Sequence, residues 1–272
     1  MKTIMLFFSF AIVMLSCKRE KIKDQIDTTT KDESIAATVF DDAYNQSEVY
    51  LASQSTTKST ENADSTGPVV TIVYSSTDSV SGQRNITLDF GTGITDNYGN
   101  TRRGKIMIQA TGRYREAGFK RIITFENYSV NAYCIEGSKT ITNIGKNSAG
   151  QSQFTIKVEN GKITTPEGDI ITWQSERTRT WIEGEATGRI WDDVYEITGS
   201  GSGVNSEGNN YTITIKTALK VKLTCRHIVE GEIEMNVDDI KEPVTINYGS
   251  GDCDAQATIR YKKQTRTISL RN

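Results

Sequence analysis

The chain has 272 residues, of which 24% are charged and 36% hydrophobic, and its formal net charge is −2. A near-neutral chain with interspersed charges lacks the concentrated basic surface that nucleic acids require, so we expect no nucleic-acid partner. A single histidine and the lack of any Cys-x-x-Cys pairing argue against a zinc site, and no cofactor motif is present, so we expect neither metal nor cofactor.

The N-terminus has the pattern of a secretory leader. Lys2 precedes an apolar run over residues 4–15, which is shorter than the ~18–20 residues that span a bilayer as a helix. The run ends in Met14-Leu15-Ser16-Cys17, which resembles the lipobox of bacterial lipoproteins. The resemblance implies a signal peptide over residues 1–16, lipidation of Cys17 and a membrane-anchored protein of the cell envelope, at the outer membrane. The alternative is an ordinary secretory leader with a chance cysteine.

Three segments follow the leader. Residues 17–33 are charged and rich in threonine, with little to bury, and are predicted to be a flexible tether. Residues 34–52 carry Ile35, Val39 and Ala43 at four-residue spacing, which predicts an amphipathic helix. Residues 53–68 are rich in Ser, Thr and Asn and are predicted to be a linker.

Residues 69–272 contain one β-pattern after another. Runs of β-branched and aromatic residues alternate with polar ones and end at Gly, Asn or Asp. Asn160-Gly161 lies between two such runs and predicts a hairpin turn. The predicted fold class is all-β: a large, mostly antiparallel sheet domain (a meander, a sandwich or a partly closed barrel) preceded by one amphipathic helix.

One motif occurs twice. Residues 86–96 and 244–254 each read as a strand that runs into a Gly-x-Gly turn, with the threonine, both glycines and the final aspartate identical. The pattern lacks the third glycine and the helix of a dinucleotide site. It predicts a duplicated hairpin that could close the sheet on itself.

The chain also resembles a lipoprotein family of Bacteroidota, flavobacteria especially. The resemblance covers residues 34–272 and depends on four segments, which begin at Asp89, Asn100, Ser175 and Thr265. The family has no established function. Surface-exported lipoproteins of this phylum often carry an acidic patch after the lipid cysteine, and Lys18-Arg19-Glu20-Lys21 departs from that pattern, which argues against display on the cell surface.

Three cysteines remain after lipidation, enough for one disulfide and one odd thiol in an oxidising compartment. Cys225 and Cys253 both lie at predicted strand ends, and the resembled family has a cysteine at each place, so these two are expected to pair. Cys134 is then expected to be a buried free thiol, because the alternative role as a nucleophile needs a base and His227 is the only histidine.

The best candidate for a ligand surface is residues 173–181. With a period of two, one face of this strand carries Trp173, Ser175, Arg177, Arg179 and Trp181. Indole rings beside guanidinium groups could stack on sugars and bind their hydroxyls, so Trp173, Arg177, Arg179 and Trp181 are the candidate site. The competing interpretation, which we prefer, is that they brace the sheet.

No catalytic motif is present, so the sequence indicates a lipid-anchored protein that works by binding or by structure. The membrane is its partner through the anchor, and a glycan or another envelope protein is the candidate ligand. The alternative function is a glycan-active hydrolase with paired carboxylates, for which Asp192-Asp193 and Asp238-Asp239 are the candidates. Adjacent carboxylates point to opposite faces in a strand, and both pairs are more typical of turns.

Overall fold

The computed structural model describes residues 5–53, 67–74, 83–187, 189, 191–225 and 227–270, with helix side chains described from 20 to 48. It contains one helix and fourteen strands within these ranges. They are α1 (Met5–Ser53), β1 (Val69–Tyr74), β2 (Arg84–Asp89), β3 (Ile94–Thr95), β4 (Thr101–Thr111), β5 (Lys120–Val130), β6 (Tyr133–Lys146), β7 (Ser152–Thr164), β8 (Ile170–Glu183), β9 (Val194–Val204), β10 (Asn210–Lys222), β11 (Ile228–Val237), β12 (Val244–Ser250), β13 (Gln256–Tyr261) and β14 (Gln264–Ser269).

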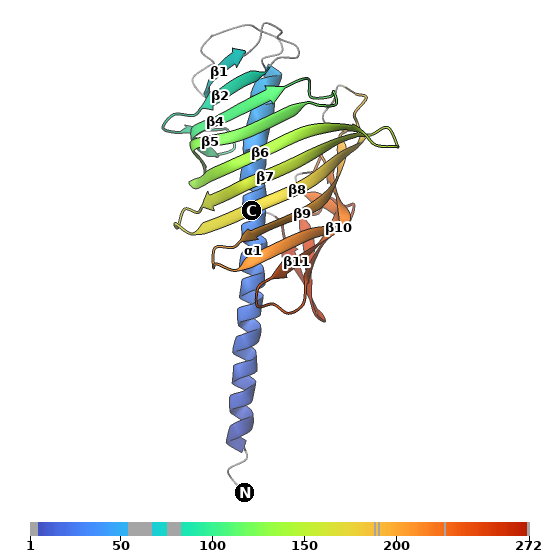
Figure 1. Cartoon of the computed structure of the whole chain (residues 1–272). Helices are drawn as coiled ribbons and strands as arrows, with labels where there is room; N and C mark the ends of the chain where they lie inside the picture. The colour runs from blue at the N-terminus through green and yellow to red at the C-terminus, as the bar shows by residue number, and fades with distance from the viewer. Residues whose placement is uncertain are drawn as a thin grey trace.

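The strands form one antiparallel meander. Each strand pairs with the next along the chain, in the order β1-β2-β4 through to β14, and β3 adds to β4. The sheet curves around helix α1 and leaves its two edge strands, β1 and β14, unpaired with each other (Figure 1). The predicted fold class is therefore confirmed, as a meander that does not close into a barrel.

Helix α1 is longer than predicted, and the prediction of a flexible tether over residues 17–33 is wrong. The helix is continuous through this segment, and Gln25, Ile26, Thr29, Asp32 and Glu33 are buried. The prediction counted only apolar side chains, whereas these polar ones find partners on the sheet. The helix ends at Ser53, close to the predicted end. Of the predicted linker over residues 53–68, residues 54–66 lie outside the described ranges.

The helix runs across the strands rather than along them. Near the middle of the helix, Gln25 donates a hydrogen bond to the Asp238 carbonyl after β11, and near the helix end the Ser47 hydroxyl accepts one from Arg121 of β5. Its apolar stripe includes Val39, Phe40 and Ala43, all buried in the same core as the concave face of the sheet. Order along the helix is thus the reverse of strand order.

Phe40 of the helix packs beside an irregularity in β7. Its ring centroid lies 5.5 Å from that of Trp173 and 5.7 Å from that of Phe125. The predicted hairpin turn at Asn160-Gly161 is wrong: β7 continues through it, and the pairing register shifts between Val158 and Gly161. This is a β-bulge with Asn160 at φ 52°, and a Cβ on Gly161 would lie 3.2 Å from the Phe40 ring.

The duplicated motif forms two similar turns near opposite edges of the sheet. One follows β2 and the other ends β12 and leads into β13. Both glycines of each copy have positive φ: 55° at Gly91 and 147° at Gly93, then 87° at Gly249 and 123° at Gly251. The repeat shapes two turns and does not close the sheet.

Candidate functional site

The candidate residues of β8 share one face, as predicted. Helix α1 covers the Trp173 end of that face, through Glu33 and Phe40. Trp181 at the other end packs against Arg115 and Tyr195 instead. Trp173 and Trp181 are 3% and 5% exposed, and Ser175 between them is buried, while Gln174 and Glu176 face solvent. A sugar platform needs accessible rings. The surface interpretation is therefore wrong for this structure, and the face braces the sheet against the helix.

Glu33 of the helix is the centre of this contact. Its Oε2 accepts hydrogen bonds from Trp173 Nε1 at 2.7 Å and from the Tyr211 hydroxyl at 3.0 Å. Its Oε1 accepts from Arg177 Nη2 at 2.9 Å. Burial raises the pKa of Glu33, against the opposing effect of Arg177 and the hydrogen bonds from Tyr211 and Trp173.

Glycines on β9 make room for these rings. Gly203 pairs with Trp173 on one side and Tyr211 on the other. A Cβ on Gly203 would lie 2.9 Å from the Tyr211 hydroxyl oxygen and 2.2 Å from the Thr172 carbonyl oxygen. The bare backbone here lets an indole and a phenol converge on one carboxylate from the helix.

A second polar contact lies further along α1. Asp42 forms a two-pronged contact with Arg102, with Nη2–Oδ1 at 2.5 Å and Nε–Oδ2 at 3.0 Å. Tyr128 donates to the same carboxylate at 3.1 Å, and Arg102 also contacts Asp96 at 2.8 Å. The Arg102 side chain is 5% exposed, so this charge is held almost entirely by protein groups.

The same polarity recurs along the part of the helix whose side chains are described: the helix supplies carboxylates and the sheet supplies cations. Besides Glu33 and Asp42, three helix carboxylates form ion pairs with the sheet: Asp27 with Arg266, Asp41 with Lys139, and Glu48 with Arg121. Asp32 instead accepts from the backbone N–H and the hydroxyl of Ser206, both at 2.7 Å. These contacts require the helix to sit in one register on the sheet.

Arg179 differs from the other cations because it contacts rings rather than a carboxylate. Its guanidinium carbon lies 4.9 Å from the ring centroid of Tyr195, 5.1 Å from Phe154 and 5.7 Å from Tyr44. Nη2 donates to the Tyr114 hydroxyl at 2.5 Å, while the buried Nε has no hydrogen-bond partner among the described residues. Burial raises the pKa of Tyr44 well above its usual value, so this phenol stays neutral.

Trp181 is held by a buried aspartate. Its Nε1 donates to Asp193 at 3.2 Å, and the Tyr195 hydroxyl donates to the same side chain at 3.1 Å. Asp193 is 4% exposed, whereas its neighbour Asp192 is exposed and accepts from Thr187. The two carboxylates of this pair therefore do not face one another across a pocket.

The other acidic candidates lie in turns. Asp238 and Asp239 follow β11, and Asp239 has φ 63°.

Asp96 lies in the turn before β4 and its pKa is lowered. Although burial raises the pKa of Asp96, hydrogen bonds from Arg102, Asn100 and the Tyr98 backbone outweigh that effect and hold the pKa at about 2. Within the described ranges, no group of three or more His, Cys, Asp or Glu residues is arranged to hold a metal ion.

The cysteines divide into a bridge and an exposed thiol. The structure joins Cys225 to Cys253, the pairing expected from the sequence, with Cα atoms 5.8 Å apart. The expectation that Cys134 is buried is wrong, because its side chain is exposed on β6. Cys17 lies in the first part of α1, before residue 20, where the side chains are not described. Its lipidation therefore stays a prediction.

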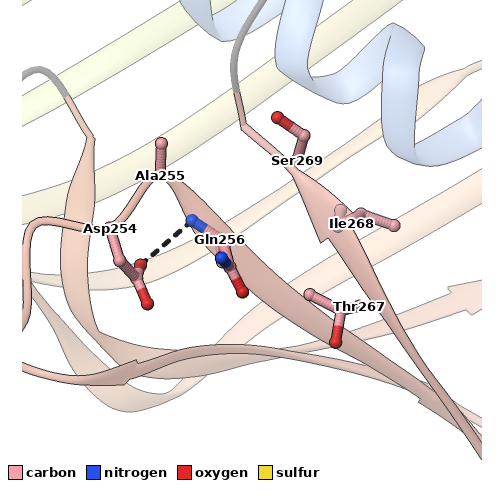
Figure 2. A pocket seen from close by; sticks show the side chains of 6 residues that line it. All are labelled: Asp254, Ala255, Gln256, Thr267, Ile268 and Ser269. Atoms are coloured by element: carbon pink, nitrogen blue, oxygen red, sulfur yellow. Dashed lines mark hydrogen bonds between the residues drawn. The ribbon is translucent and has the colours of Figure 1, made fainter.

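Two hollows in the described part of the structure lie away from the candidate residues. The larger is a groove of about 400 Å³ between β13 and β14, lined by six residues (Figure 2): Asp254, Ala255, Gln256, Thr267, Ile268 and Ser269. The smaller, of about 240 Å³, lies beside Thr101 and Asn131. Neither contains a pair of carboxylates.

The chain matches no family model, no curated protein and no solved structure. Its function must therefore be argued from its own residues. No stretch of the described helix is long and apolar enough to cross a membrane.

Sequence reasoning missed the central residue of the site. Glu33 falls in the segment predicted to be a tether, because a lone carboxylate in a Thr-rich stretch gives no sign of burial. A signal was nevertheless present: Gln25, Thr29 and Glu33 recur at four-residue spacing, which places them on one face of a helix.

Proposed function

We propose that this protein is a lipid-anchored component of a bacterial cell envelope that works by binding or by structure, with helix α1 as a rigid stalk. The lipobox at Cys17 supports the anchor. The continuity of α1 from the segment around Cys17 into the buried contacts at Gln25 supports the stalk, and this observation carries the proposal.

The length of the stalk follows from helix geometry. At about 1.5 Å per residue, the span from Cys17 to Gln25 is about 12 Å. An acyl group on Cys17 would therefore hold the sheet close to the bilayer surface, in an orientation set by the helix. Lys18, Arg19, Lys21 and Lys23 lie in this segment, where anionic headgroups would attract them.

We infer that a partner does not bind the β8 face, because Glu33 and Phe40 of α1 contact Trp173 on that face. The surfaces left for a partner are the outer face of the sheet, the loops and the two edge strands. We therefore propose another envelope protein as the partner rather than a glycan stacked on Trp173 and Trp181.

Metabolic labelling tests the anchor. Cells expressing the wild-type chain or Cys17→Ser are fed labelled palmitate and fractionated. We expect label and membrane association in the wild type and neither in the variant. Cys134→Ser is the matched control and should label like the wild type. A wild type that never incorporates label overturns the anchor.

A further inference from the structure

The last strand of the sheet has an open side. Leu270 N–H donates to the Ala255 carbonyl at 2.8 Å, which sets the hydrogen-bonding phase between β14 and β13. In an antiparallel pair this phase alternates, so Gln264, Arg266 and Ile268 direct their backbone groups toward β13. The backbone N–H and C=O of Thr265 and Thr267 then point away from the sheet. Among the described residues, no strand pairs with that side.

A hollow lies at the end of this strand. The groove of about 400 Å³ is lined by Thr267, Ile268 and Ser269 of β14 and by Asp254, Ala255 and Gln256 at the start of β13 (Figure 2). Ile268 is half-buried there, beside exposed Thr267. The edge thus offers outward-pointing backbone donors and acceptors at Thr265 and Thr267, and the hollow lies next to it, at the ends of β13 and β14.

The hairpin that carries this edge is basic. Between Gln256 and Leu270 the chain has four Arg or Lys residues and no Asp or Glu. Arg266 is paired with Asp27 and Lys262 with Glu242, the latter at 3.8 Å. Arg260 and Lys263 are exposed and form no ion pair with any described residue, so positive charge is left over beside the open edge.

We propose that β14 is an acceptor edge for an extended acidic segment of a partner protein. The segment pairs with the backbone of Thr265 and Thr267 and adds one strand to the sheet. Acidic side chains on its outer face lie within reach of Arg260 and Lys263. A second copy pairing through the same edge would bring two basic hairpins together, which like-charge repulsion disfavours.

Peptide binding to the full-length chain in detergent tests this proposal, independently of lipid anchoring. The probe is a fluorescein-labelled ten-residue peptide of alternating Glu and Val, and the control peptide alternates Lys and Val. We expect saturable binding of the Glu peptide by fluorescence anisotropy, and binding of the Lys peptide at least tenfold weaker. Failure of the Glu peptide to bind at millimolar concentration overturns the proposal.

Thr267→Pro tests the backbone contact. Proline removes an N–H that points outward and leaves the β13 ladder intact, so the fold should survive. We expect at least tenfold weaker binding than in the matched Thr267→Ala, at a similar melting temperature. Equal binding by the two variants overturns the proposal.

Two further measurements keep the result decisive. If Thr267→Pro fails to fold, the double variant Arg260→Glu, Lys263→Glu should lose Glu-peptide binding at least tenfold, and unchanged binding contradicts the proposal. Analytical ultracentrifugation compares self-association of the wild type and of Thr267→Pro. We expect no self-association of the wild type that is lost in the variant. Such self-association would identify a second copy as the occupant and overturn the acidic partner.

Discussion

The indole nitrogen of Trp173 donates a hydrogen bond of 2.7 Å to Oε2 of Glu33, although the two residues are 140 positions apart. This contact joins helix α1 to β8, in the middle of the sheet. It shows why α1 belongs to the folded body: its polar side chains are partners of buried groups on strands that the chain reaches only much later.

Truncation of either buried tryptophan should destabilise the protein. Trp173→Ala and Trp181→Ala each remove a ring that is at most 5% exposed, and each should lower the free energy of unfolding by ~3–5 kcal/mol. Trp191→Ala is the control: its side chain is 67% exposed and its loss should cost less than about 0.5 kcal/mol. Denaturant melts measure all three, and a Trp173→Ala melt that does not shift would contradict the assignment of this face to the core.

Asp42 should matter more than an exposed acid of the same charge. Asp42→Ala leaves the Arg102 guanidinium buried with one fewer partner, and we expect a loss of about 2–3 kcal/mol because Asp96 remains in contact. The control is Glu126→Ala, which breaks an ion pair with Lys105 whose side chains are 37–50% exposed and should cost less than about 1 kcal/mol. Equal losses in the two variants would mean that the helix contact adds little.

The pH dependence of stability should include a contribution from Asp96. Its pKa is lowered in the folded protein to about 2 from the model-compound value of 3.8, so the folded state favours the ionised form. The stability that Asp96 contributes is full above pH 3.8 and is lost as the pH falls toward 2. The difference in unfolding free energy between wild type and Asp96→Asn should shrink over this interval. A difference that stays constant from pH 6 to pH 2 would be the contrary result.

The cysteines give opposite expectations for bridge and thiol. Non-reducing peptide mapping should find the Cys225 and Cys253 peptides linked, and reduction should lower stability by roughly 3–4 kcal/mol for a loop of 28 residues. Cys134 should react with an alkylating reagent in the folded protein, because its side chain is exposed. Protection of Cys134 until unfolding, or a link that includes it, would contradict the structure.

Local sequence patterns predicted the sheet well because a strand's period of two is a local property. The alternation over residues 173–181 placed Trp173, Ser175 and Trp181 on one face, and the structure buries all three. The same reasoning failed for the tether, because burial of Asp32 and Glu33 depends on Ser206 and Trp173, far away in the chain.

The site was only half predictable for a related reason. The sequence identified the Trp–Arg face but gave no sign of what covers it. The pair Asn160-Gly161 is a strong local turn signal and predicted a hairpin turn. In the structure the pair forms a bulge within β7, where Gly161 lies beside the ring of Phe40 from the helix. In each case the deciding partner is distant in sequence.

Native-state hydrogen exchange of the full-length chain tests whether α1 is an integral part of the folded body. We predict that amides from Gln25 to Ser47 exchange as slowly as those of β8, because the same buried contacts protect both. Amides between Gln25 and Glu33 that exchange within seconds, while β8 stays protected, would show a flexible tether and contradict the buried position of the helix.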